Sequence, residues 1–309
     1  MKYSNLSTED KALIVAAYNR ESSQADTQNS LAALFGVTTR TVRAWAKNLG
    51  LTGVELSNDF RVMIYDIETS RVTAKVWWTG KQYVGHKQLT EEPKIISISW
   101  KWLGEDKIHA LTWDKNHCDK KMLGKFLAEY NTADMVVGQN NDRFDNRWVN
   151  ARAMKHGLHF NTFLKSFDVM KQTKRLFRLP SYSMDYITKY LNVENKQTHE
   201  GIKMWDMIQD GNKSQQKEYL KKMVAYNVGD IVSTEAMYVK LRKYMGHKVH
   251  FGVLAGKPKY SSPSDGSLDI RLIRTTASAA GTLQYIMESN TDGVQFKISN
   301  SAYKQFLNS

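Results

Sequence analysis

The chain of 309 residues is 41% hydrophobic and 24% charged, so it can bury a sizeable core and is not a disordered protein. Its formal net charge of +13 at pH 7 indicates a polyanionic partner, either nucleic acid or a membrane surface. The single cysteine, Cys118, excludes an internal disulfide framework and a multi-thiolate zinc site. A catalytic metal would therefore be held by oxygen ligands, with or without histidine.

The sequence contains neither a membrane-spanning pattern nor a secretion signal. No apolar run approaches the roughly 20 residues that cross a bilayer. The first residues, MKYSNLSTEDKALI, lack the apolar core of a signal peptide. We therefore expect a cytoplasmic protein without a membrane partner.

Residues 1–52 are predicted to form a small all-α domain. Helices are expected over three stretches, 7–21, 27–35 and 39–50. Gly36 breaks the chain between the second helix and the third. Ser7 is a suitable N-cap for the first helix, because Asp10 follows three residues later as in a capping box.

The spacing of small and apolar residues in this segment is similar to that of the helix-turn-helix family. Ala32 allows close helix contact, Gly36 suits a tight turn, and Val42 can dock the following helix, with a tryptophan one turn later. In this interpretation three residues face DNA, namely Thr39, Arg40 and Arg43. The alternative is a three-helix bundle that binds a protein partner or only packs.

After a predicted linker at 51–60, short β-rich runs alternate with helical patterns. Strands are expected at 61–65, 95–102, 107–113 and 134–138. Helices are expected over 118–131, 146–157, 181–192 and 215–245. Strands followed by helices indicate an α/β or α+β domain with a mixed sheet. Residues 247–309 are predicted to be a small basic extension with two strands around an Asn-Thr-Asp-Gly turn.

Three aromatic residues, Trp77, Trp78 and Tyr83, lie in an apparent insertion between the first two predicted strands. Two interpretations are open. The aromatic rings stack on nucleic-acid bases, or they pack within a β-hairpin, which is the interpretation that we favour from the sequence.

The segment RVMIYDIETS, residues 61–70, ends an apolar strand with two carboxylates. Asp66 and Glu68 are two residues apart, so on a strand they point to the same face of the sheet. Two like charges this close need a cation, or one of them must become protonated. The pair therefore indicates a metal site, with a solvated strand end as the alternative.

Two later segments raise the case for a metal site. Phe144 and Asp145 end the pattern Asn-x-x-x-Phe-Asp after a buried apolar run, and Tyr226 lies one helical turn before Asp230. In chain order, Asp-Ile-Glu-Thr, Asn-x-x-x-Phe-Asp and Tyr-x-x-x-Asp resemble the three exonuclease motifs of the DEDD 3′–5′ exonuclease superfamily, in the version found in proofreading domains of B-family DNA polymerases. The segment at 179–196 resembles the family's region between the second motif and the third.

The resemblance covers about residues 60–245. It implies a ribonuclease H-like fold, a mixed sheet flanked by helices, for residues 60–246. It also implies four carboxylate ligands for two Mg²⁺ or Mn²⁺ ions, namely Asp66, Glu68, Asp145 and Asp230. The remaining residues leave no room for a polymerase palm or fingers, so we expect a stand-alone nuclease.

Tyr226 takes the place of the family's tyrosine that orients the attacking water. The histidine branch of the superfamily has histidine at the position of Ala225, so the resemblance favours the tyrosine branch. A core tyrosine on an amphipathic helix is the alternative.

The resemblance also suggests neighbours of the reacting strand end. Thr69 and Asn140 are predicted to make polar contacts with the terminal nucleotide, and Phe144 to stack on it or, equally, to be a core residue. Four basic residues are predicted to follow the phosphates, namely Lys171, Lys174, Arg175 and Arg178. A solvated helix face explains these four equally well.

The favoured function is therefore a metal-dependent 3′–5′ exonuclease that releases nucleoside monophosphates from DNA, delivered to nucleic acid or to a protein partner by the N-terminal helices. One alternative is a non-catalytic DNA-binding regulator that uses the helix-turn-helix. Another is an exoribonuclease with the same active site. A compact exonuclease with an appended helix-turn-helix would suit a phage or mobile-element replication protein.

Overall fold

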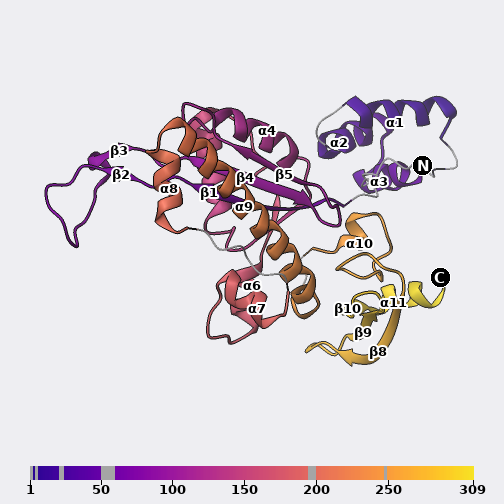
Figure 1. Ribbon diagram of the computed structural model, residues 1–309. Helices are drawn as coiled ribbons and strands as arrows, with labels where there is room; N and C mark the ends of the chain where they lie inside the picture. Colours follow the sequence, from indigo (N-terminus) through magenta and orange to yellow (C-terminus); the bar gives the residue numbers. More distant parts are fainter. Residues whose placement is uncertain (1–2, 4–5, 21–23, 50–59, 194–199, 247–248) are drawn as a thin grey trace. The chain divides into compact units, whose positions relative to one another are not determined.

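The structure is a computed structural model that describes residues 3, 6–20, 24–49, 60–193, 200–246 and 249–309 (Figure 1). It divides into two compact units, Met1–Asp59 with Leu254–Gly256 and Phe60–Val253 with Lys257–Ser309. Residues 51–59 of the predicted linker lie outside the described residues. Each unit is therefore considered by itself.

The first unit contains the three helices that the sequence predicts. They are α1 (Thr8–Arg20), α2 (Gln24–Phe35) and α3 (Thr39–Asn48). The Ser7 hydroxyl accepts the Asp10 N–H and the Asp10 carboxylate accepts the Ser7 N–H, each at 3.0 Å, so the predicted capping box is present. Gly36 has φ +58°, the left-handed conformation that ends α2.

A small apolar core joins these three helices. Val42 and Trp45 of α3 are buried together with Ile14 of α1 and Leu31 of α2. The Trp45 ring meets Phe35 edge to face at 5.4 Å between ring centroids. The apolar residues Val42 and Trp45 thus hold the three helices together, whereas the arginines of α3 are exposed.

The second unit is built on a mixed sheet of five described strands in the order β5-β4-β1-β6-β7. The strands are β1 (Val62–Thr69), β4 (Ile95–Trp102), β5 (Ile108–Thr112), β6 (Met135–Gly138) and β7 (Lys165–Asp168). The central strand β1 pairs antiparallel with β4 and parallel with β6. The sequence predicted the first four of these strands and missed β7, which has only four residues and a polar sequence.

Helices cover both faces of this sheet (Figure 1). Tyr65 and Ile67 of β1 belong to the core that includes residues of α4 (Lys120–Tyr130) and α5 (Asp145–His156). Val62 and Ile64 belong to the opposite core, which includes residues of α9 (Lys213–Leu241). Because side chains alternate along a strand, every second residue of β1 faces α9.

Shorter elements complete the second unit. They are α6 (Val169–Leu176), α7 (Met184–Tyr190), α8 (Ile202–Gln209), α10 (Phe251–Leu254), and the single-turn helices η2 (His86–Gln88) and η3 (Arg242–Tyr244). A two-stranded ribbon of β2 (Thr73–Ala74) and β3 (Leu89–Glu91) lies between β1 and β4 in the chain and extends away from the sheet (Figure 1). The sequence did not predict α8.

The C-terminal residues form a second antiparallel sheet in the order β10-β9-β8. Its strands are β8 (Ile270–Ala277), β9 (Leu283–Ser289) and β10 (Gln295–Ser299), and α11 (Asn300–Leu307) follows them. The two predicted strands correspond to β9 and β10, whereas β8 and α11 were missed. A core that includes Met287 and Ile298 packs against Ala302 of α11.

Among the residues that the structure describes, no helix combines the length and the apolar character needed to cross a bilayer.

Candidate active site

The acidic pair of β1 lies on the face of the sheet that α9 covers. Asp66 and Glu68 continue the alternation of Val62 and Ile64, which are buried beside residues of α9. Both acids are only partly buried, because they occupy the carboxyl-terminal half of the strand. The strand thus carries apolar residues into the core at one end and two partly buried carboxylates at the other.

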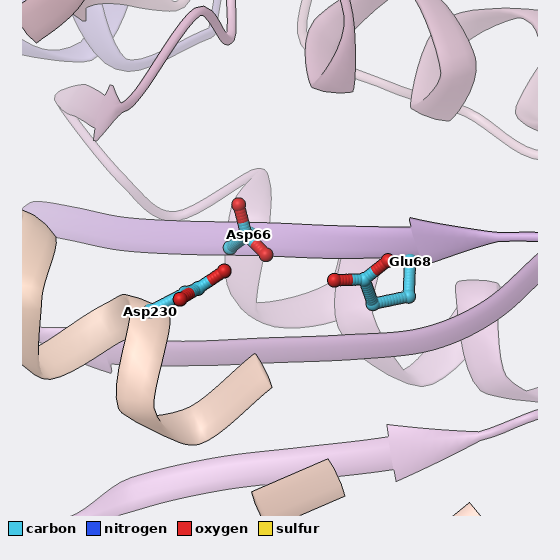
Figure 2. A group of neighbouring side chains, drawn as sticks. All are labelled: Asp66, Glu68 and Asp230. Carbon is cyan, nitrogen blue, oxygen red and sulfur yellow. The ribbon is translucent and has the colours of Figure 1, made fainter. Parts of the chain in front are cut away.

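Asp230 of α9 completes a cluster with this pair. Asp66, Glu68 and Asp230 each offer a carboxylate oxygen, and these oxygens all lie within 4.8 Å of one another (Figure 2). Asp230 itself is buried. Three like charges at this separation, one of them buried, favour a bound cation, and an all-oxygen donor set suits Mg²⁺ or Mn²⁺. The residues present therefore fit a divalent metal.

Tyr226 lies one helical turn before Asp230 and faces the same cluster. Burial raises the pKa of Tyr226 well above its usual value, and the negative charges of Asp230, Glu68 and Asp66 raise it further. The tyrosine is therefore a neutral phenol at physiological pH. Its hydroxyl is a hydrogen-bond donor and acceptor beside the three carboxylates.

Asn227 holds Asp66 in place and was not identified from the sequence. Its side-chain amide donates a hydrogen bond of 2.6 Å to an Asp66 carboxylate oxygen. Its own carbonyl accepts a bond of 2.8 Å from the Ser97 hydroxyl of β4. Asn227 and Ser97 are both fully buried. The two hydrogen bonds that link Ser97, Asn227 and Asp66 therefore fix the orientation of the Asp66 carboxylate.

Asp145 lies close to this cluster but outside the group of three. It begins α5, is buried, and its carboxylate accepts the Ile67 N–H of β1 at 3.1 Å. Burial raises the pKa of Asp145 to about 7, and the nearby charges of Asp168 and Asp230 contribute to the increase. The acid of the second motif, Asp145, thus lies beside β1. Its carboxylate oxygen binds the backbone N–H of Ile67, the residue between Asp66 and Glu68.

The loop between β6 and α5 is shaped by Asp168 at the end of β7. Asn140 has φ +67°, an uncommon conformation for a residue with a side chain. The Asp168 carboxylate accepts the Asn140 N–H at 3.1 Å and the Asp142 N–H at 3.3 Å, and it also caps α6 by accepting the Lys171 N–H. Asp168 therefore stabilises the turn that presents Asn140. This role has no recognisable signature in the sequence.

Phe144 is 38% exposed, so its interpretation as a core residue is wrong. Its ring lies 6.2 Å from that of Trp148 on α5. Thr69, the last residue of β1, is partly buried, and its carbonyl accepts the Trp205 indole N–H of α8 at 2.9 Å. Phe144 is thus exposed near the carboxylates, whereas Thr69 is tied by its backbone to α8.

The four predicted basic residues, which lie in α6 and just after it, divide into two groups. A cleft with a volume of about 470 Å³ is lined by eight residues, namely Asn140, Asp142, Arg143, Arg147, Asp168, Met170, Lys171 and Lys174. Lys171 forms an ion pair of 2.8 Å with Asp142. Arg175 and Arg178 are exposed but do not line this cleft. The structure therefore adds Arg143, from the turn before α5, and Arg147 of α5 to the predicted basic set.

In the first unit, Arg40 and Arg43 are exposed and Thr39 is partly buried at the start of α3. The Arg43 guanidinium donates a hydrogen bond of 2.9 Å to the Gln28 side chain of α2. Arg43 is thus held against the neighbouring helix.

The fold and the acidic cluster agree with the comparison to protein families. The RNase_H superfamily model matches residues 63–242, more than half of the chain, and the chain belongs to that superfamily. This confirms the ribonuclease H-like fold. No curated protein matches this chain.

One similar solved structure is the family B DNA polymerase from the hyperthermophilic archaeon Pyrobaculum calidifontis. The two share 13% sequence identity, and the similarity has a TM-score of 0.45 and covers 64% of this chain. The chain spans about a quarter of the polymerase, of which 26% is covered.

Proposed function

We propose that the protein is a metal-dependent 3′–5′ exonuclease that releases nucleoside monophosphates from DNA. One observation carries the proposal. Asp66 and Glu68 of β1 converge with Asp230 of α9 within 4.8 Å, in a chain of the RNase H superfamily. The order of the three motifs supports the 3′–5′ direction, and the tyrosine beside the cluster supports the tyrosine branch of the DEDD exonucleases.

In this proposal four residues hold two Mg²⁺ or Mn²⁺ ions, namely Asp66, Glu68, Asp145 and Asp230. When bound, the ions activate a water and stabilise the leaving 3′ oxygen of the phosphodiester. The amide of Asn227 keeps the Asp66 carboxylate oriented toward the cluster. The Tyr226 hydroxyl, neutral and adjacent to the three carboxylates, hydrogen-bonds the attacking water and sets its direction.

In this proposal the DNA strand lies in the cleft lined by the loop before α5 and by α6. Lys171 and Lys174 contact its phosphates together with Arg143 and Arg147. Phe144 is exposed and stacks on the terminal base, and Asn140 and Thr69 make polar contacts with the last nucleotide. Arg175 and Arg178 contact phosphates farther along the strand.

The test is the double substitution Asp66→Ala with Glu68→Ala. We expect release of nucleoside monophosphates from single-stranded DNA to fall by about 10³-fold or more, because two of the metal ligands are lost. Parallel reactions with 5′-labelled and 3′-labelled strands, with Mn²⁺ or with EDTA, report direction and metal dependence.

The matched control is Glu105→Ala with Asp106→Ala, which removes two adjacent exposed acids from the turn between β4 and β5. This control keeps wild-type activity. Equal activity of the Asp66/Glu68 variant and the wild type would show that the metal site is assigned wrongly. Digestion of matched DNA and RNA strands decides between the exonuclease and the exoribonuclease.

For the other parts of the chain we propose that residues 1–52 are a helix-turn-helix domain, followed by the exonuclease domain at 60–246 and a basic extension at 247–309. Thr39, Arg40 and Arg43 then contact DNA. Substituting Arg40 with Ala reduces binding to duplex DNA in this case, and it leaves binding unchanged if the helices bind a protein.

A further inference from the structure

The ribbon of β2 and β3 and the loop that joins them, residues 73–91, form an arm that carries three exposed aromatic residues. Trp77 is 92% exposed, Trp78 is 63% exposed and Tyr83 is 90% exposed. The sequence-based preference for a packed hairpin is therefore wrong for these three side chains. Three large aromatic side chains exposed on one short arm indicate a binding site, because exposure to water is unfavourable for them.

The charge of the arm indicates the chemistry of its partner. Residues 73–91 contain three lysines and a single acid, Glu91. Lys75, Lys81 and Lys87 are all exposed and alternate along the chain with the aromatic residues. Exposed aromatic rings between lysines match a strand whose unpaired bases stack and whose phosphates carry negative charge.

The base of the arm is fixed beside the candidate active site. Ser70 and Lys94 close it with two hydrogen bonds of 2.8 Å, one from the Ser70 N–H to the Lys94 carbonyl and one from the Lys94 N–H to the Ser70 hydroxyl. Arg71 is tied to α8 by an ion pair with Asp206 and by its N–H, which donates to the Gln209 side chain at 2.9 Å. The arm is thus an extension of the strand that carries Glu68.

The tip of the arm lies within reach of a strand whose end occupies the acidic cluster. Trp77 lies nine positions after Glu68, a path of at most about 30 Å. Within the loop, the Gln82 side chain donates to the Trp78 carbonyl at 2.5 Å, and the Lys75 N–H donates to the Gln88 carbonyl at 2.9 Å. These bonds link the two sides of the loop and give the aromatic residues a defined support.

We propose that the arm is a stacking platform for single-stranded nucleic acid, which holds bases upstream of the 3′ end while the acidic cluster acts on that end. Trp77, Trp78 and Tyr83 stack on the bases, and Lys75, Lys81 and Lys87 contact phosphates. The inference rests on the proposed exonuclease function, which places the 3′ end at the acidic cluster. Binding of nucleic acid to the arm is measurable without cleavage.

The test compares a long substrate with one that cannot reach the arm. In the variant Trp77→Ala/Trp78→Ala/Tyr83→Ala, we expect KM for single-stranded DNA of about 20 nucleotides to rise about tenfold or more, because base stacking is lost. The kcat value is unchanged, and so is hydrolysis of the p-nitrophenyl ester of thymidine 5′-monophosphate. The variant Trp77→Phe/Trp78→Phe/Tyr83→Phe keeps aromatic rings and restores KM.

The matched control is Phe163→Ala, which removes an aromatic ring that is 91% exposed and lies outside the arm. It leaves KM for the long strand unchanged. A triple alanine variant with wild-type KM for the long strand would overturn the proposal. Equal loss on both substrates would also overturn it, because the arm would then support the active site itself.

Two further measurements separate this proposal from the proposed function and from protein binding. Fluorescence anisotropy of a 5′-labelled strand in EDTA tests the arm even if the wild type cleaves neither substrate, and affinity must fall in the triple alanine variant. Substituting Lys75, Lys81 and Lys87 with Ala must make the plot of log association constant against log salt concentration less steep by about 2. This value follows from three phosphate contacts, each of which contributes about 0.7 to the slope. If sedimentation instead shows wild-type self-association that the triple alanine variant loses, the arm is a protein contact and the proposal is wrong.

Discussion

Asp119 and Asp66 are both carboxylates that receive hydrogen bonds from helical side chains, but the donors differ in charge. Asp119 is fully buried and accepts two bonds from the Arg152 guanidinium, at 2.6 and 2.8 Å. The His156 Nε2 atom lies 2.7 Å from Asp119 Oδ1, and the Ile95 N–H donates to Asp119 Oδ2 at 3.1 Å. Asp66 instead receives a neutral amide from Asn227 and faces two further carboxylates.

The difference separates a structural acid from a functional one. A buried carboxylate held by a guanidinium is electrostatically satisfied within the protein, so Asp119 can join α5 to the start of β4 permanently. A cluster of three carboxylates stores repulsion that a cation relieves. The same residue type therefore stabilises the fold in one place and creates a ligand site in the other, and substitutions at the two places must have opposite effects.

The largest expected effect on stability is at Asp119. Asp119→Ala lowers the free energy of unfolding by about 3–5 kcal/mol, because it leaves the Arg152 guanidinium buried without its partner. Urea denaturation in EDTA measures the loss. The control Asp185→Ala removes an exposed ion pair with Lys189 on α7 and costs at most about 0.5 kcal/mol. A loss of similar size in both variants would contradict the comparison.

The pH dependence of this effect has a definite sign. Burial raises the pKa of Asp119, but the bonds from Arg152 and His156 outweigh it and the net pKa is lowered. A carboxyl group whose pKa is lower in the folded protein than in the unfolded chain stabilises the fold fully when the pH is above its unfolded-state pKa, about 3.9 for Asp. That stabilisation is lost as pH falls through the folded pKa. The stability difference between wild type and Asp119→Asn therefore shrinks below about pH 4.

The next largest expected effect is the stabilisation by metal, which should depend on the acidic cluster and not on Asp119. Saturating Mn²⁺, at about 100 times its dissociation constant, stabilises the wild type by about 2.7 kcal/mol because it binds only the folded state. Glu68→Gln loses most of this increase, whereas Asp119→Ala keeps it. In EDTA, Glu68→Gln is at least as stable as the wild type, since one repelling charge is gone. Thermal unfolding with and without metal measures all three proteins, and a Glu68→Gln protein that is destabilised in EDTA would contradict the charge argument.

The fold and the acidic residues of the candidate site were predictable where the signal is local. The alternation along RVMIYDIETS determines which residues of β1 face α9, and the four-residue spacing of Tyr226 and Asp230 places both on one side of a long helix. These are properties of neighbouring residues, so a single sequence contains them.

The remaining features depend on partners far apart in the chain. The bond from Ser97 to Asn227 joins residues 130 positions apart, and neither residue type is distinctive by itself. The four-residue strand β7 is too short and too polar to give a pattern. Trp77 and Tyr83 matched a packed hairpin in sequence, but packing requires a second layer, and composition does not reveal whether that layer exists.

The smallest expected effects test whether Asn227 acts through Asp66. Asn227→Ala lowers kcat and Mn²⁺ affinity by about 10–100-fold, because residues that orient metal ligands typically contribute this much. Ser97→Ala removes only the bond behind Asn227 and costs about 2–10-fold in kcat, the equivalent of one hydrogen bond.

Ser99→Ala is the matched control for Ser97→Ala. Ser99 is also fully buried on β4, two residues farther along the same face, and its hydroxyl has no hydrogen-bond partner among the described residues. Its substitution should leave kcat within about twofold of the wild type, because no bond is lost. Equal losses at Ser97 and Ser99 would mean that the serines affect packing alone. A loss at Ser97 only, accompanied by weaker Mn²⁺ binding, would show that orientation of Asp66 is transmitted from β4 through α9.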